Sequence, residues 1–329
     1  MAVSSLVSVW ASMARQHPDR PAVSIGEDLT LTWRELQARS NQVARLLKSK
    51  GVASGDLVTI ALPTEVKAVE AILATLKIGA TPNVISPRLP DLERKQIIEL
   101  ADPRIVIGEH ASALTNHPVL ADWGDLSGYD DADLPEIIAP CLKAPTSGGS
   151  TGRPKIILSG SPAMVDDAPD TIARLMGFEI GGTCLFPGPL YHNTALTGLL
   201  IGLGLRNHVV LEKRFDPEMT LRLIEKYRAD IAILVPTMMN RIWRLPDEIR
   251  RKYDLSSLRL VQHNAGACQP DLKRAWIDWL GADRIMENYT STEQTAMTMV
   301  SGSDWLDRPG TVGKPVLGDI EIRDEEGVP

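Results

Sequence analysis

Short apolar runs alternate with amphipathic stretches along most of this 329-residue chain. The run "GDLVTIALP" has the apolar, β-branched composition of a buried strand, and "EVKAVEAILATLKIGA", which follows it, has apolar residues at helical spacing. The same order returns in the second half, where "HVVLE" precedes the helical "DPEMTLRLIEKYRA". Because parallel strands are joined by crossovers that are usually helices, this order predicts an α/β fold with parallel sheets covered on both faces.

The alternation begins again near the middle of the chain, which predicts two parallel-type α/β subdomains packed together. We expect the first over residues 1–165 and the second over residues 166–299. From Val300 onward the pattern turns strand-like, with Gly and Pro between the runs, so residues 300–329 are expected to start a small β subdomain.

One helix can be bounded closely from its end signals. Thr32 and Glu35 have the spacing of a capping box, in which each residue accepts a hydrogen bond from the backbone of the other. The apolar residues that follow recur at helical spacing until Gly51. We therefore expect a helix that starts near Thr32 and is closed by Gly51.

Composition and charge exclude several classes of protein. Hydrophobic residues make up 43% of the chain and charged residues 23%, which is ordinary for a soluble globular protein. The net charge of -7 and the lack of a basic block argue against nonspecific binding of nucleic acid. Three cysteines lie far apart with no C-x-x-C pair, which excludes a cysteine zinc site and suits a reducing cytoplasm. No signal peptide and no membrane span are expected, so we predict a cytoplasmic location.

The segment "PTSGGSTGRPKII" is unusually rich in glycine and hydroxyl side chains. A flexible linker is one interpretation. However, strand-like sequence flanks the segment, which favours a tight loop over residues 146–155 whose amides form a concave site for phosphate, with Lys155 as a nearby cation. The spacing of its glycines fits neither the Walker loop nor the dinucleotide fingerprint. The candidate phosphate-binding residues are Ser147, Gly148, Gly149, Ser150, Thr151, Gly152 and Lys155.

Two further polar segments, "NAGAC" and "ENYTSTEQT", each follow a predicted strand. Ligands in open α/β sheets bind beyond the carboxyl ends of the strands, so both segments and the Ser/Gly loop are expected to line one crevice. Tyr289 offers a ring on which a base can stack, Thr292 offers a hydroxyl for a phosphate oxygen, and Glu293 offers a carboxylate suited to magnesium. An exposed polar loop is the plain alternative.

The Ser/Gly loop resembles the signature [ST]-[ST]-G-[ST]-T-G-x-P-K of adenylate-forming, AMP-binding enzymes, a superfamily that includes acyl-CoA synthetases, peptide-synthetase adenylation domains and luciferases. Gly148 stands where that family usually has a hydroxyl residue. "ENYTSTEQT" resembles the family's Y-G-x-T-E motif, with Thr290 in place of a glycine that lines the acyl entrance. "RPGTVGKPVLG" resembles its G-x-x-G-x-P segment.

The resemblance implies a role for each matching position. It places the nucleotide, ATP, against the Ser/Gly loop and against two further sets of residues, Asn264, Ala265, Gly266 and Ala267, and Glu287, Asn288, Tyr289 and Thr290. It implies catalytic roles for Lys155, His192, Thr292 and Glu293, with Mg²⁺ held by Glu293. It implies that the acid substrate contacts His192, Asn193, Met238, Gly266 and Thr290.

Two features predict the kind of acid. Asn193 follows His192 at a position where amino-acid-activating relatives place an aspartate, and a buried ammonium without a counter-ion would be costly, so we expect an acid without an amino group. Met238, Met239 and Trp243 suggest a bulky, hydrophobic, polycyclic acid of the steroid or terpenoid kind, although these side chains could instead fill the core. The overall similarity to bile-acid-type acyl-CoA ligases points the same way.

We therefore predict an acid–thiol ligase that joins a carboxylic acid to AMP and then transfers the acyl group to the thiol of coenzyme A. An enzyme that loads a carrier protein, and a non-catalytic acyl or nucleotide binder, stay open as alternatives, as does a homodimer; a P-loop kinase is disfavoured by the failed Walker pattern. The family continues beyond the point that corresponds to Pro329, so the chain is expected to be an N-terminal portion without the C-terminal lid domain and impaired in catalysis.

Overall fold

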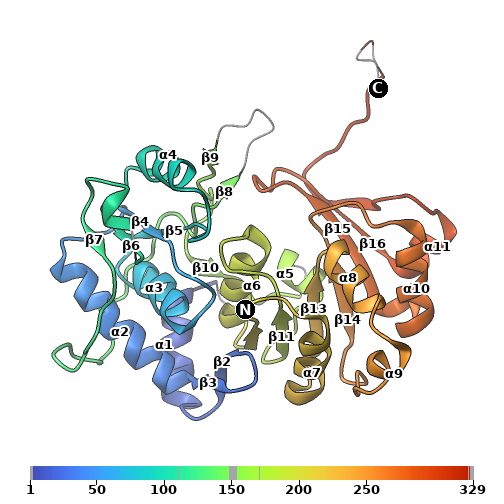
Figure 1. Cartoon of the computed structure of the whole chain (residues 1–329), viewed down its shortest axis with the longest axis horizontal. Helices are drawn as coiled ribbons and strands as arrows, with labels where there is room; N and C mark the ends of the chain where they lie inside the picture. Colours follow the sequence, from blue (N-terminus) through green and yellow to red (C-terminus); the bar gives the residue numbers. More distant parts are fainter. Residues whose placement is uncertain (1–2, 110, 148–153, 170, 325, 327–329) are drawn as a thin grey trace.

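A computed structural model describes residues 3–109, 111–147, 154–169, 171–324 and 326. It contains two α/β halves, each with helices and a sheet, that lie side by side (Figure 1). The first half of the chain lies on one side and the last third on the other. The strands of the first sheet and the central strands of the second run parallel to their neighbours, which confirms the predicted α/β class.

The first sheet has four parallel strands in the order β5-β4-β6-β7. Helices α1 to α4 belong to this half, and α2 packs against α3. The capping box at the start of α2 is present, because the hydroxyl of Thr32 accepts from the Glu35 N–H at 3.2 Å and the Glu35 carboxylate accepts from the Thr32 N–H at 2.8 Å. The elements are α1 Leu6–Gln16, α2 Trp33–Ser49, β4 Leu57–Ile60, α3 Val66–Lys77, β5 Thr81–Val84, α4 Asp91–Ala101, β6 Ile105–Ile107, the 3₁₀ turn Ala111–Ala113 and β7 Val119–Leu120.

The second sheet has nine strands in the order β17-β16-β15-β14-β13-β11-β12-β2-β3. Its six central strands are parallel, and β3, β16 and β17 are antiparallel to their neighbours. Its strands are β2 Pro21–Ile25, β3 Leu29–Thr32, β11 Thr183–Phe186, β12 His208–Leu211, β13 Ile231–Leu234, β14 Leu260–His263, β15 Ile285–Thr290, β16 Met297–Ser301 and β17 Lys314–Leu317. Its helices are α5 Ile172–Leu175, α6 Asn193–Gly204, α7 Pro217–Tyr227, α8 Pro236–Trp243, α9 Asp247–Arg250, α10 Pro270–Leu280, the 3₁₀ turn Ala282–Arg284 and α11 Gly302–Asp307.

Two small pairs of strands complete the structure. The pair β1 Ser4–Ser5 and β10 Met164–Val165 is antiparallel, as is the hairpin β8 Thr146–Ser147 and β9 Lys155–Ile156. Figure 1 shows this hairpin between the elements of the first half and the ends of β15 and β16.

Several elements cross the boundaries expected from the sequence. The strands β2 and β3 come from the first 165 residues and extend the second sheet, and β16 begins before residue 300. The tail after Val300 also contains the helix α11, which the strand-like pattern did not indicate. The division at 165/166 and 299/300 stays a prediction.

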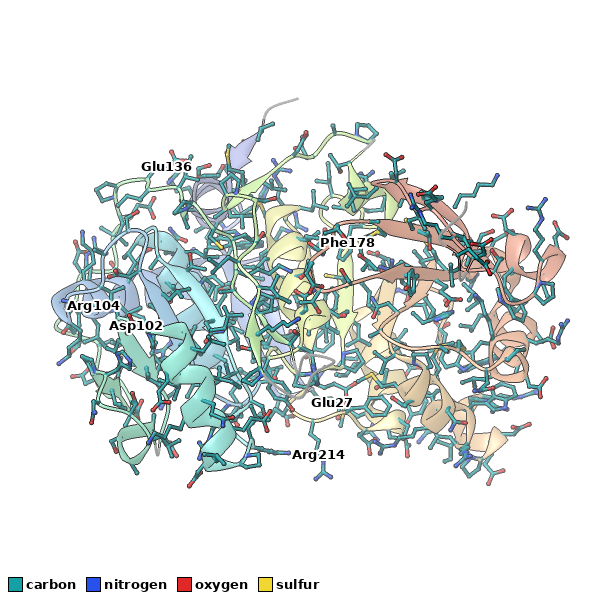
Figure 2. The ribbon with its side chains drawn as sticks, turned by 90° about the horizontal axis from the view of Figure 1, so that it is seen from above. Glu27, Asp102, Arg104, Glu136, Phe178 and Arg214 are labelled. Atoms are coloured by element: carbon teal, nitrogen blue, oxygen red, sulfur yellow. The ribbon has the colours of Figure 1, made fainter. Side chains whose placement is uncertain are left out.

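One buried apolar cluster joins the two halves. It contains Ile60 of β4 and Leu73 of α3 together with Phe186 of β11 and Leu199 of α6. Phe178, which Figure 2 shows near the middle of the molecule, stacks on Phe186 with ring centroids 6.1 Å apart. By contrast, Figure 2 shows Asp102 and Arg104 at the outer end of the first half. The two halves therefore share one hydrophobic core. Every helix that the structure describes is too short or too polar to reach across a lipid bilayer.

Candidate active site

A cavity of about 750 Å³ opens at the carboxyl ends of β11, β13, β14 and β15. Here the chain order of the strands changes direction, because β12 lies on one side of β11 and β13 to β15 lie on the other. Such a switch point is where parallel α/β sheets form ligand crevices. The lining residues are Phe186, Gly188, Pro189, His192–Ala195, Ile233, Val235–Met238, Asn264–Ala267 and Thr290–Thr292.

This cavity brings together many of the predicted site residues. His192, Asn193, Met238, Thr290 and Thr292 all contribute to its wall, and so do all four residues of the predicted adenine-flanking set, 264–267. Apart from His192, none of the lining side chains is ionisable in the part of the chain that the structure describes. The wall is therefore apolar with a few hydroxyl and amide groups.

The lining helps to decide which residues of α8 meet a ligand. Met238 lines the cavity, but Met239 is fully buried in the core and Trp243 stacks on the Arg250 guanidinium at 3.7 Å from the ring centroid. Met239 instead packs in a buried apolar cluster that also contains Leu234 of β13. The interpretation of Met239 and Trp243 as pocket residues is wrong for this cavity.

His192 is held at the start of α6 by the loop before it. The Leu190 N–H donates to the hydroxyl of Thr64, a buried residue that follows β4, at 3.0 Å. The ring of His192 lies 4.9 Å from that of Tyr191, centroid to centroid. Desolvation lowers the pKa of His192 below its ordinary value of 6.5, so its imidazole is neutral near pH 7.

The turn after β14 presents backbone to the cavity. Asn264 is buried, and its side-chain oxygen lies 3.3 Å from the hydroxyl of Thr194, which donates to it. Ala265 has φ of 64°, a left-handed conformation that non-glycine residues rarely adopt. Nothing lies within 4 Å of the position that a Cβ of Gly266 would take. A flat group could therefore approach this turn closely.

The four residues from Glu287 to Thr290 do not share one environment. Glu287 accepts a hydrogen bond from the buried Lys273 ammonium at 2.5 Å, and Asn288 is buried with an unpartnered side-chain oxygen. The ring of Tyr289 is exposed, which leaves it free to stack. Thr290 donates to the Ala296 carbonyl at 2.7 Å. Of these four, only Thr290 lines the cavity.

Glu293 lies exposed in the turn after β15, next to the cavity residue Thr292. Within the described ranges no three His, Cys, Asp or Glu side chains gather into a metal site. A single carboxylate still fits Mg²⁺, which binds through one or two carboxylates and completes its shell with phosphate oxygens and water.

The β8–β9 hairpin places Ser147 directly opposite Lys155. It is anchored to the first sheet by Asn83, whose side-chain amide donates to the Ala144 carbonyl at 2.6 Å and to the Thr146 hydroxyl at 3.2 Å. The predicted phosphate-binding residues Gly148, Gly149, Ser150, Thr151 and Gly152 lie outside the described residues.

Sequence reasoning missed Lys143, a buried lysine at the back of the site. Its ammonium donates to the side-chain oxygens of Asn193 and Thr197 on α6. The sequence carries no signal for this contact, because fifty residues separate the partners and the surrounding "PCLKAP" shows no pattern.

Comparison with known families gives a match over almost the whole chain. The family described as AMP-binding enzyme matches residues 10–329. The 4-coumarate-CoA ligase 1 of Narcissus pseudonarcissus is 27% identical over 304 residues, which cover 84% of this chain and 55% of that protein. The putative acyl-CoA ligase YdaB of Bacillus subtilis is 25% identical over 328 residues, 91% of this chain and 63% of that protein. The chain thus spans between about half and two thirds of the length of these relatives.

A solved structure has the same fold. The inhibitor-bound N-terminal domain of FACL13 from Mycobacterium tuberculosis superposes with a TM-score of 0.80 at 20% sequence identity, over 99% of this chain and 86% of that one. At this identity the match establishes the shared architecture of two α/β halves.

Proposed function

The chain belongs to the AMP-binding enzyme family, and from this we propose that it activates a carboxylic acid with ATP and passes the acyl group to the thiol of coenzyme A. Membership of the family confirms the resemblance drawn from the Ser/Gly loop. The proposal for this chain rests on one observation, the cavity at the carboxyl ends of four parallel strands.

The first step would join two anions. A carboxylate oxygen of the acid attacks the α-phosphorus of ATP, the bond from that phosphorus to the bridging oxygen breaks, and pyrophosphate leaves. Lys155 and the amides of the Ser/Gly loop are proposed to hold the leaving phosphates, and Thr292 the α-phosphate. Mg²⁺ bound to Glu293 would neutralise part of the phosphate charge. Such chemistry depends mainly on positioning and electrostatics.

The second step would move the acyl group. The thiolate sulfur of coenzyme A attacks the acyl carbon, the bond to the phosphate oxygen breaks, and AMP leaves. The neutral imidazole of His192, at the N-terminus of α6, is proposed to separate the nucleotide-binding part of the cavity from the acyl-binding part. A carrier-protein thiol is the alternative acceptor.

The cavity wall supports an acid without an amino group. No carboxylate lines it in the described part of the chain, so a substrate ammonium would lack a counter-ion there. Phe186, Ile233, Val235 and Met238 provide apolar surface for the body of the acid. We propose a bulky hydrophobic acid, of which a polycyclic steroid or terpenoid acid is one kind.

The test uses acyl-sulfamoyl adenosines, stable mimics of acyl-adenylates, and calorimetry. We expect a mimic with a bulky apolar acyl group to bind at least tenfold more tightly than AMP, because it fills both parts of the site. In parallel, the matching acid should promote exchange of labelled pyrophosphate into ATP. Equal affinity for AMP and for every mimic, with no exchange, would contradict the proposal.

A further inference from the structure

Lys143 is a buried cation directly behind the cavity wall. The residue is only 3% exposed. Its backbone is fixed, because its carbonyl accepts from the Ser159 N–H at 3.0 Å. The ammonium donates to the side-chain oxygens of Asn193 and Thr197, which lie one turn apart on α6. The lysine is therefore held against the helix that starts at the cavity.

The charge of Lys143 has no compensating carboxylate in the described part of the chain. Another buried lysine near the site, Lys273, instead pairs with Glu287 at 2.5 Å. Burial of an unpaired cation is costly, and it lowers the pKa of Lys143 to about 8. The side chain is still mostly protonated at pH 7, so its positive field acts on the cavity wall.

The contact with Lys143 also settles the orientation of an amide. A protonated ammonium has three N–H donors and no acceptor, so the group of Asn193 that faces it must be the carbonyl oxygen. The Thr197 hydroxyl, at 3.2 Å, reinforces this orientation by donating to the same oxygen. The amide nitrogen of Asn193 therefore points away from Lys143.

That amide nitrogen is available to a ligand. Asn193 lines the cavity, and its nitrogen has no hydrogen-bond partner among the described residues. Because this nitrogen is not one of the buried polar atoms without a partner, it must be exposed to the cavity or to solvent. An N–H donor polarised by a neighbouring cation forms a stronger hydrogen bond to oxygen than an isolated amide does.

We propose that Lys143 is a positioning residue that fixes Asn193 as an N–H donor on the cavity wall, so that the site selects acids whose body carries an oxygen acceptor, a hydroxyl or keto group, over the same acids without it. The selectivity rests on the proposed function, whereas the fixed orientation of Asn193 does not. The two parts can therefore fail separately.

The orientation is tested without any acid. The side-chain amide resonances of Asn193, assigned by an Asn193→Ala variant, are followed by ¹⁵N–¹H NMR from pH 6 to 10. We expect them to shift with a midpoint near pH 8 as Lys143 loses its proton, and to lose this titration in Lys143→Met. Desolvation holds the pKa of His192 below 6.5, well under the expected midpoint, and Cys141→Ser removes the thiol that acts on Lys143 electrostatically. Resonances that do not respond to pH or to Lys143→Met would overturn the assignment.

The selectivity is tested with matched pairs of acyl-sulfamoyl adenosines: cholate with 5β-cholanate, 4-coumarate with cinnamate, and salicylate with benzoate. We expect wild type to prefer the oxygenated member of at least one pair by about tenfold, the worth of one hydrogen bond. Lys143→Met and Asn193→Ala should each abolish that preference, and the double variant should lose no more than either alone. Lys143→Gln, which keeps an N–H donor, should restore part of it.

The matched control is Lys77→Met. Lys77 is also buried and surrounded by neutral acceptors, the carbonyl and side chain of Gln37 and the side chains of Ser40 and Asn41, but it lies between α2 and α3. We expect it to lower stability without changing the preference. The proposed selectivity would be contradicted if the losses of preference from Lys143→Met and Asn193→Ala added up in the double variant. It would also be contradicted if Lys77→Met changed the preference as much as Lys143→Met does. If no mimic binds better than AMP, the proposed function fails, and the NMR titration still decides the orientation.

Discussion

Lys155 provides the most direct residue-scale prediction. Lys155→Ala should weaken ATP binding by about tenfold to a hundredfold, because a charge-assisted hydrogen bond to phosphate is worth about 1.5–3 kcal/mol. Calorimetry with ATP and Mg²⁺ measures the loss. The exposed Lys48 on α2 offers a matched control, since Lys48→Ala removes the same charge far from the cavity. Equal affinities for all three proteins would remove Lys155 from the site.

The burial of Lys143 predicts a dependence of stability on pH. Its pKa in the folded chain is about 8, below the ordinary 10.5, so the unfolded chain binds more protons between these values. Stability conferred by this residue therefore rises with pH in that window. Relative to Lys143→Met, the wild-type free energy of unfolding should increase by about 2–3 kcal/mol from pH 7 to pH 10. Urea unfolding at several pH values measures it, and a difference that stays constant would contradict the prediction.

Among single residues, local contacts were predictable from the sequence and contacts between distant residues were not. Thr32 and Glu35 lie three residues apart, so their reciprocal hydrogen bonds follow from the sequence alone. The ion pair of Lys273 with Glu287, and the contact of Lys143 with Asn193, join different elements, and only the packing of those elements brings them together.

At the scale of elements, strands and helices with strong periodicity were predictable, whereas their partners were not. The strand β2 and the hairpin partner β3 could not be assigned to the second sheet from sequence, because strand pairing depends on which faces pack. The helix α11 was missed because only six residues form it, too few for a periodic signal. The gathering of the turns after β14 and β15 was predictable, since parallel strands end at one edge.

The helix α6 packs closely against the sheet at two glycines, Gly198 and Gly202, and this gives an element-scale prediction. A Cβ at Gly198 would lie 2.0 Å from the ring of Phe186, and one at Gly202 would lie 2.8 Å from Val209. Gly198→Ala should therefore destabilise the chain by about 1–3 kcal/mol, despite the better helix propensity of alanine. It should also weaken binding of the acyl mimic, because α6 begins at Asn193.

Urea unfolding and calorimetry on Gly198→Ala measure the two effects. Gly160→Ala is the control, because nothing lies within 4 Å of the added Cβ there. Stability of Gly198→Ala at or above that of Gly160→Ala would show that α6 does not need this close approach.

At the scale of the whole molecule, the two halves share one buried cluster, and this predicts cooperative unfolding. The cluster contains Trp33 of the first half and Phe186 and Leu199 of the second, so neither half can open without exposing the core of the other. Trp33 lies in this cluster and Trp276 in a second buried cluster within the other half, and ¹⁹F NMR of 5-fluorotryptophan-labelled protein reports on each. Coincident transitions in urea are expected. Separate transitions for Trp33 and Trp276 would show two independent units.

The central claim is that one crevice holds both the acyl group and AMP, and a crystal of the chain with an acyl-sulfamoyl adenosine tests it most directly. We expect the acyl group among Phe186, Ile233 and Met238, with the adenosine against the turn after β14 and the ring of Tyr289. A mimic that binds elsewhere and leaves this cavity empty would contradict the account.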